Sequence, residues 1–246
     1  MTDAPLPPHL AIPSFVAIGV RAFVTTRAAG TYGLPEHGED PDATARWQAL
    51  QSALIPLGAP RLASARQVHG TRVLVHAGAW DGWVRVDGAD GHLLTGGGAA
   101  AVTIADCVPV FVAHPSGVVA VVHAGWRGVA GGILPEAIRA FAARGLAVDE
   151  LVVHLGPSIC GRCYEVGESV YEQLTGWSTA RPRNVDLRAL LAEQATQSGV
   201  TRWTASGECT KCDNDVLFSH RAGDSGRQVA VIVAPATPPR TPSAHP

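Results

Sequence analysis

Two apolar runs near the middle of the chain constrain the fold more than any other feature. Val108–Ala113 and Val118–His123 are rich in β-branched residues and flank the turn sequence His-Pro-Ser-Gly, a pattern that predicts a β-hairpin. Cys107 would begin the first strand and His123 would end the second. Because a hairpin brings the chain back to the level at which it started, we expect Cys107 and His123 to be neighbours.

The register of this hairpin decides whether the two side chains share a face. With a four-residue loop, Ala113 pairs with Val118. His123 then faces Val108, and Cys107 points to the opposite face of the sheet. With a five-residue loop, or with a bulge, we expect Cys107 to face His123 directly, with Cβ atoms about 4.5–5.5 Å apart. We therefore predict the odd register or a bulge.

A thiolate beside an imidazole is a ligand pair that zinc accepts. His69 is the best candidate for a third ligand, because it precedes the β-rich run 71–76 and Gly70 allows a sharp turn after it. Three protein ligands leave a fourth position open, as in catalytic zinc sites. Taken alone, the local sequence favours a simpler interpretation, in which Cys107 and His123 are packing residues at strand ends.

The bulk composition excludes several classes of protein. The 246 residues carry a formal net charge of -2, so no basic excess indicates a nucleic acid partner. No run approaches the ~20 apolar residues of a membrane-spanning helix, and the N-terminus lacks the pattern of a signal peptide. We therefore expect a cytoplasmic protein without nucleic acid or membrane partners.

The apolar periodicity predicts both helices and strands. Helices are expected at 42–55, with Asp42 as N-cap, at 133–144 and at 186–198. Strands are expected at 15–24, 73–76, 102–104, 108–113, 118–123, 151–155 and 229–233. Without regular βαβ alternation, this mixture predicts an α+β fold, with mixed or antiparallel sheets layered with helices. We expect a flexible start at 1–12, a single catalytic domain at 13–234 and a disordered Pro-rich tail at 235–246.

The cysteine count is odd, which argues against a secreted disulfide scaffold. Apart from Cys107, the cysteines form two Cys-x-x-Cys pairs, Cys160 with Cys163 and Cys209 with Cys212. Such pairs resemble two halves of a structural zinc site. Their separation exceeds that of a zinc ribbon, however, and Arg162 and Lys211 would crowd the cluster. Free thiols or an opportunistic disulfide are therefore favoured over a second zinc.

Several motifs together resemble the YfiH-like family, also called the laccase-domain or multicopper polyphenol oxidase family. They are QVHG (67–70), GADGHLLT (88–95), ADCVP (105–109), HAGWRG (123–128), GPSICGRCYEVG (156–167), ECT (208–210) and SGRQ (225–228). The resemblance runs from about Thr25 to Gln228 and implies the sandwich fold of YfiH-like and CNF1-like proteins. It also implies a metal site at His69, Cys107 and His123. At 25–33, TTRAAGTYG lacks the double glycine and the serine of the family's opening motif.

The resemblance implies purine nucleoside metabolism. The implied reactions are phosphorolysis of adenosine, inosine, guanosine and methylthioadenosine, and deamination of adenosine, so nucleosides and phosphate are the expected partners. Zinc is the expected cofactor, with copper as the alternative. Zinc suits deamination because it lowers the pKa of bound water towards ~7.

Candidate site residues surround the predicted metal ligands in the sequence. The catalytic candidates are Cys107, Asp106, which adjoins it, and Glu165. The candidates for substrate binding are Arg27, Gln67, Trp126, Arg127 and Tyr164. Each also has a structural interpretation: solvated arginines, a turn glutamine, a core or lid tryptophan, a strand-end aspartate and an ion-paired glutamate.

Three other functions compete with a zinc nucleoside enzyme. A copper-dependent phenol oxidase is disfavoured, because the chain has no His-x-His pair and its only methionine is Met1. A metal-free hydrolase would use Cys107 as nucleophile and His123 as base. A non-catalytic protein that binds a metal or a partner is the third. The sequence does not assign an oligomeric state.

Overall fold

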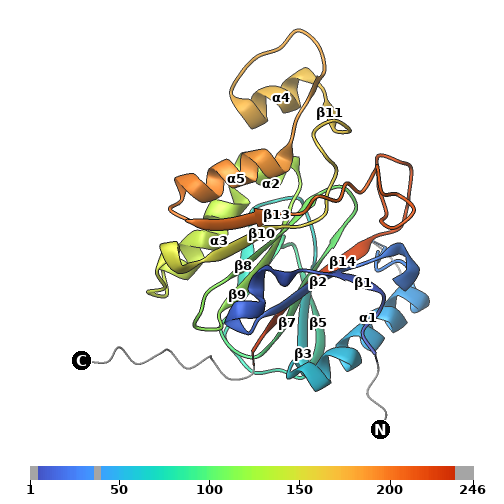
Figure 1. Ribbon diagram of the computed structural model, residues 1–246. Helices are drawn as coiled ribbons and strands as arrows, with labels where there is room; N and C mark the ends of the chain where they lie inside the picture. The colour runs from blue at the N-terminus through green and yellow to red at the C-terminus, as the bar shows by residue number, and fades with distance from the viewer. Residues whose placement is uncertain (1–4, 36–39, 236–246) are drawn as a thin grey trace.

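Two six-stranded sheets stacked face to face form the body of the protein (Figure 1). The computed structural model describes residues 5–35 and 40–235. The first sheet has the order β1 (His9–Ala11), β2 (Arg21–Thr25), β14 (Gln228–Ala234), β7 (Gly98–Ile104), β3 (Arg61–Arg66) and β5 (Gly82–Asp87). The second has the order β13 (Arg202–Ala205), β10 (Val152–Leu155), β8 (Val108–Ala113), β9 (Val119–Ala124), β6 (Gly91–Leu94) and β4 (Val73–His76). A short pair, β11 (Glu165–Val166) and β12 (Arg183–Asn184), lies apart.

Helices cover the outer faces of both sheets (Figure 1). Helix α1 (Pro41–Leu54) buries Trp47, Leu50 and Leu54 against the first sheet. Helices α2 (Trp126–Gly131), α3 (Ile133–Ala142) and α5 (Leu187–Gln197) cover the second, and α4 (Glu168–Thr175) packs beside them. Mixed pairing and helical outer layers confirm the predicted α+β class.

Strand alternation produces separate apolar layers. In β8, Val110 and Val112 face the helices, whereas Phe111 faces the space between the sheets with Ile104 and Ile232 of the first sheet. Phe111 has no exposed surface. A strand buried on both faces is uniformly apolar, so β8 and β9 read as continuous hydrophobic runs in the sequence.

Several element predictions need correction. The expected strand at 15–24 is a 3-10 turn (Pro13–Ile18) followed by β2, because Gly19, with φ of 72°, breaks the run. Asp40 rather than Asp42 caps α1, accepting the Ala43 N–H at 2.9 Å, since Pro41 occupies the first helical position. Strand β1 falls within the segment expected to be flexible, and most of the expected tail lies outside the described residues.

Three connections cross from the first sheet to the second and meet at one end of the sandwich. They are residues 67–72 between β3 and β4, 88–90 between β5 and β6, and 105–107 between β7 and β8. The three crossings carry His69, Asp90 and Cys107 in turn. Residues from distant parts of the sequence are therefore brought to one place by the topology, next to the end of β9.

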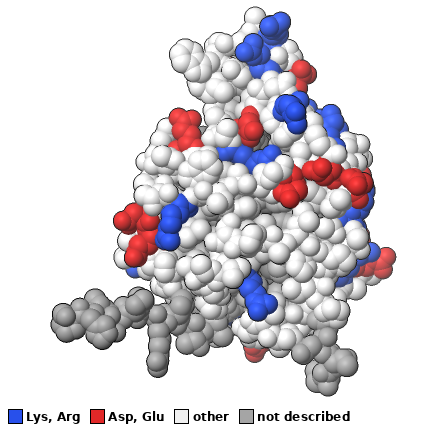
Figure 2. Space-filling view, in the orientation of Figure 1, with Lys and Arg blue, Asp and Glu red and all other residues white. Residues whose placement is uncertain are grey.

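The distribution of charged side chains on the surface agrees with the small net charge of the chain. On the face in Figure 2, acidic and basic side chains are interspersed and most of the surface is uncharged. Within the described parts of the chain, every helix is too short or too polar to cross a lipid bilayer.

Buried His92 makes the fold sensitive to acid. Burial, reinforced by the charge of His76, lowers the pKa of His92 to about 3. Below pH 6.5 the unfolded chain binds a proton at this position that the folded protein does not accept until the pH approaches 3, so stability falls as the pH drops. Between pH 7 and pH 5, His92 is expected to account for about 2 kcal/mol of lost unfolding free energy.

A His92→Gln variant tests this expectation, because Gln cannot titrate but can retain a hydrogen bond to His76. Urea unfolding of both proteins at pH 7 and pH 5 measures the loss for each. The variant should lose less stability than the wild type over this range. Equal losses in the two proteins would show that His92 does not contribute.

Candidate functional site

The β8–β9 hairpin sets the relation between Cys107 and His123. Ala113 pairs with Val119 and Pro109 with His123, which leaves a five-residue loop and confirms the odd register. The predicted direct opposition of Cys107 and His123 is wrong, because the residue opposite His123 is Pro109. Cys107 lies just before β8, diagonal to His123, with its thiol turned towards the same end of the sandwich.

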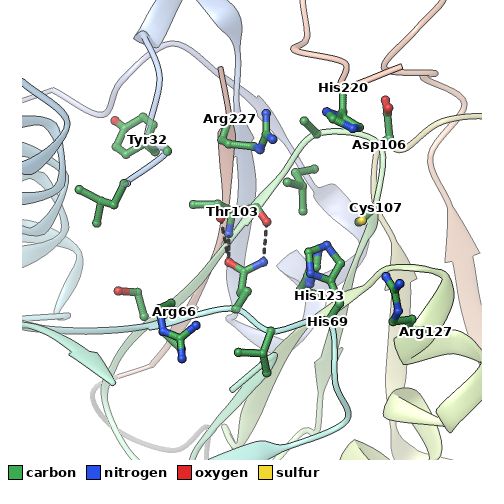
Figure 3. Close-up of a pocket in the computed structure, with 18 of the residues that line it drawn as sticks. Tyr32, Arg66, His69, Thr103, Asp106, Cys107, His123, Arg127, His220 and Arg227 are labelled. Atoms are coloured by element: carbon green, nitrogen blue, oxygen red, sulfur yellow. Dashed lines mark hydrogen bonds between the residues drawn. The ribbon is translucent and has the colours of Figure 1, made fainter. Parts of the chain in front are cut away.

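The structure brings His69, Cys107 and His123 together (Figure 3). Their ligand atoms all lie within 4.8 Å of one another, and the imidazole centroids of His69 and His123 are 4.8 Å apart at 79°. His123 is buried, Cys107 is half-buried and His69 is exposed. Three soft or borderline ligands with one exposed side form a site that can hold zinc and admit a further ligand.

Asp90 is the organising residue that the sequence prediction missed. Its Oδ1 accepts the His69 N–H and the His123 Nδ1–H, both at 2.9 Å. Its Oδ2 accepts the N–H groups of Val68 at 3.2 Å and Gly70 at 2.7 Å. Since His123 uses Nδ1 for Asp90, its Nε2 is the atom left for a metal, which is the usual carboxylate–histidine arrangement at zinc sites.

The charges of the site favour a thiolate. Burial raises the pKa of Cys107, but the charges and hydrogen bonds of His123 and His69 outweigh that effect and hold the pKa below its ordinary value. Burial likewise raises the pKa of Asp90, and hydrogen bonds from His123 and Gly70 lower it overall. Burial lowers the pKa of His123, but the charge of Cys107 and the hydrogen bond to Asp90 raise it overall, so metal binding would use the thiolate and displace the proton of His123.

Backbone strain and close packing hold the ligands in place. His69 has φ of 59° and Asp106 has φ of 86°, the two non-glycine residues with positive φ in the described structure. Such conformations cost about 1–3 kcal/mol and persist where the surroundings require them. Gly125, between β9 and α2, packs against the ligands: a Cβ there would lie 3.0 Å from the Cys107 Sγ and 3.1 Å from the His69 Cδ2.

The three ligands lie in a pocket of about 800 Å³. They lie together in Figure 3, and Tyr32 is at the opposite side of the view. Sequence reasoning missed several residues that line the pocket: Tyr32, Arg66, Arg85, His220, Arg221 and Arg227. SGRQ contains Arg227, but nothing in that motif indicates that the guanidinium faces a pocket.

Four of the predicted substrate residues line this pocket: Gln67, Trp126, Arg127 and Tyr164. The Arg127 guanidinium lies over the Trp126 ring at 4.3 Å, and that of Arg221 lies over the Tyr164 ring at 5.2 Å. Gln67 has a clear structural role, because its amide donates to the Thr103 carbonyl and accepts the Thr103 N–H, both at 2.8 Å (Figure 3).

The remaining candidate residues differ in whether they line the pocket. Asp106 lines it, but its carboxylate already accepts the Thr210 hydroxyl at 2.6 Å and the Arg221 N–H at 2.7 Å. Arg27 lies outside the lining, bound to Asp224 at 2.6 Å. Glu165 is exposed and lines a separate hollow with residues 181–184. Arg27 therefore has a structural partner of its own, and Glu165 lies outside the lining of the pocket that holds the thiol.

A second group of potential metal ligands lies outside this pocket. The thiols of Cys160, Cys163, Cys209 and Cys212 lie within 4.8 Å of one another. Among the described residues, these four and the His69 cluster are the groups of three or more His, Cys, Asp or Glu side chains close enough to share an ion.

Similarity to known proteins agrees with this geometry. The family model described as "Multi-copper polyphenol oxidoreductase laccase" matches residues 23–235. The purine nucleoside phosphorylase of Deinococcus radiodurans is 34% identical over 246 aligned residues, covering 93% of this chain and 91% of that protein. The purine nucleoside phosphorylase Rv2149c of Mycobacterium tuberculosis is 36% identical over 235 residues, covering 88% and 93%.

A solved structure shows the same fold. The hypothetical protein YfiH of Bacillus licheniformis has a TM-score of 0.80 and 21% identity, covering 93% of this chain and 97% of that one. The family match spans the whole second sheet, most of the first sheet and all three crossings that form the candidate site. The chain therefore belongs to the laccase-domain family, the family of the YfiH-type proteins.

Proposed function

We propose that this protein is a zinc-dependent purine nucleoside phosphorylase, with the metal held by His69, Cys107 and His123. The observation that carries the proposal is the convergence of these three ligands, supported by Asp90, on a pocket lined with arginines. Relatives named purine nucleoside phosphorylase at 34–36% identity supply the reaction class. A volume of about 800 Å³ is in the range of sites for small organic ligands.

In phosphorolysis, a phosphate oxygen bonds to the ribose C1′ while the bond from C1′ to the purine nitrogen breaks. The electron pair passes to the purine, which takes up a proton. The phosphate is negatively charged, so it needs cations held in advance. Arg127 and Arg221, each stacked on an aromatic ring beside the ligands, meet this need with charge-assisted hydrogen bonds.

Two further residues prepare the pocket. Burial, together with the charge of Cys107, raises the pKa of Tyr164 to about 12, so its hydroxyl remains a hydrogen-bond donor at neutral pH. Asp106 acts as a positioning residue, because it fixes the Arg221 backbone and Thr210 beside the pocket. When bound, zinc supplies Lewis-acid polarisation in the same place.

The substrate range is a finer part of the same proposal. Adenosine, inosine, guanosine and methylthioadenosine share the purine, the ribose C1′ and the bond that is broken, so one phosphate-binding site serves all four. Deamination of adenosine is proposed as a second reaction. The exposed side of the ligand cluster, at His69, supports it, because deamination needs access for water as well as for the base.

Copper-dependent phenol oxidation fits the ligand sets less well. A multicopper oxidase must gather several copper ions to reduce dioxygen. In the parts of the chain that the structure covers, there are two clusters of potential metal ligands: one is a His-Cys-His set, and the other consists of four thiols. Neither is a histidine-rich multinuclear centre, so the family's printed description is not the function we propose.

A metal-free thiol hydrolase has one observation in its favour. Asp90, His123 and Cys107 lie in the order of an acid, a base and a nucleophile. That arrangement leaves His69 unexplained, although its imidazole also faces the thiol from a strained backbone. A metal accounts for both imidazoles, so we favour the metal site.

The direct test is incubation of purified protein with inosine and phosphate, followed by chromatography of the bases. We expect release of hypoxanthine that requires phosphate, is lost on chelation and returns on addition of zinc. The matched control is Cys107→Ala, which removes one ligand and leaves the rest of the pocket. Release no greater than with this control would contradict the proposal. Turnover that survives chelation but is lost on thiol alkylation would favour the hydrolase.

A further inference from the structure

The two Cys-x-x-Cys pairs meet because of strand pairing. β10 and β13 are parallel neighbours, with Leu155 opposite Ala205. Their carboxyl ends lie at the same edge of the sheet, and each is followed by a loop that carries one pair, at 160–163 and 209–212. An isolated bridge between Ser158 and Cys209 continues the alignment beyond the strands. The long separation in sequence therefore does not keep the pairs apart.

The spacing of the sulfur atoms suits a tetrahedral metal. Four thiolates at 2.3 Å from a zinc ion lie about 3.8 Å from one another. The Sγ atoms of Cys163 and Cys212 are 3.5 Å apart, and all four lie within 4.8 Å. A disulfide would need a separation of about 2 Å between two sulfurs, whereas all four cysteines are free thiols here.

The loops around the cluster are built to present sulfur. The Cys163 N–H bonds to the Cys160 carbonyl at 2.9 Å, and the Asp213 N–H bonds to the Cys209 carbonyl at 2.8 Å, so each pair lies on a closed turn. The Cys160 N–H donates to the Cys209 Sγ at 3.2 Å. Asp213 accepts the Cys209 N–H at 2.8 Å and holds the second turn. Hydrogen bonds of this kind support thiolate ligands.

The cations between the cysteines do not crowd the cluster, contrary to the expectation from sequence. Arg162 and Lys211 are both exposed. Four thiolates around a divalent ion carry a net charge of two minus, so neighbouring positive side chains favour the occupied state.

We propose that Cys160, Cys163, Cys209 and Cys212 form a second, structural zinc site. Tetrahedral sulfur ligands select zinc or iron–sulfur centres, and four single thiolates close the coordination of one zinc without leaving a position for substrate. This ion joins two loops that lie next to residues of the candidate pocket. Tyr164 follows Cys163 directly, and Thr210, next to Cys209, bonds to Asp106, next to Cys107.

Metal content measured by mass spectrometry tests the proposal on the full-length protein, purified without chelator. We expect two zinc ions per chain in the wild type and one in each of two variants, Cys107→Ala and Cys163→Ser/Cys212→Ser. Cys107→Ala leaves the four-cysteine cluster untouched. Its retained ion, exchanged for cobalt, should show the thiolate-to-metal absorption of a tetrahedral sulfur site.

The outcomes separate this proposal from the proposed function. A Cys107→Ala protein without metal would overturn the second site, as would an intact mass that shows the four cysteines joined in disulfides. Iron rather than zinc in that variant would also overturn it. One zinc in both the wild type and Cys107→Ala, with none in Cys163→Ser/Cys212→Ser, would support the second site and count against the metal in the pocket.

Discussion

Replacement of Asp90 by asparagine is expected to lower metal affinity at the His69–Cys107–His123 site by about 10–100-fold. Each carboxylate oxygen of Asp90 accepts two N–H groups: Oδ1 from His69 and His123, and Oδ2 from Val68 and Gly70. An amide offers only one acceptor, so its NH₂ group must face two donors. Either the 68–70 loop or the His123 ring then moves, and both carry a metal ligand.

The same substitution should also destabilise the fold. Asp90 has no exposed surface, and hydrogen bonds to a charged group are each worth about 1.5–3 kcal/mol. We expect the free energy of unfolding to fall by about 3 kcal/mol, measured by urea denaturation, and zinc affinity to fall in a competition titration with a chromophoric chelator. Asp149→Asn, an exposed substitution of the same kind, is the control. An unchanged zinc affinity in Asp90→Asn would show that Asp90 does not orient the ligands.

The hairpin was predictable because its information is local. Two apolar runs and the short turn between them predict which strands pair, and the parity of the loop length decides which side chains share a face. The placement of Cys107 and His123 on one face follows from an odd loop length, whereas their diagonal arrangement does not. The crossing that contains Cys107 lies outside the regular strand, and its φ values are set by tertiary contacts rather than by local preference.

The rest of the site depends on contacts between distant segments. Asp90 lies in a crossing whose neighbours in the sequence give no sign that His123 and the 68–70 backbone will converge on it. Arg27 seemed able to bind an anion, but its guanidinium meets Asp224, nearly two hundred residues away. The four cysteines looked unsuited to one ion until the parallel pairing of β10 with β13 aligned their loops. Each case needed the sheet order, which local periodicity does not determine.

Replacement of Gly125 by alanine is expected to impair the metal site while leaving the fold nearly intact. The backbone there has φ of -75° and ψ of 172°, which alanine adopts without strain. The new methyl group would lie 3.0 Å from the Cys107 Sγ and 3.1 Å from the His69 Cδ2, closer than carbon atoms normally approach sulfur or a ring. The ligands must shift by a few tenths of an ångström, and we expect zinc affinity and phosphate-dependent nucleoside cleavage to fall by about 10-fold or more.

Gly167 provides a closely matched control for this substitution. It caps α4 with φ of -70° and ψ of 167°, as Gly125 caps α2, but a Cβ at Gly167 has nothing within 4 Å. Loss of a glycine cap costs both variants a similar few tenths of a kcal/mol to about 1 kcal/mol, so thermal unfolding should shift equally. Only Gly125→Ala should lose zinc affinity and activity. If Gly167→Ala loses as much, the effect belongs to helix capping; if Gly125→Ala loses neither, the thiol and the His69 ring have room to move and the site is less tightly organised than its contacts indicate.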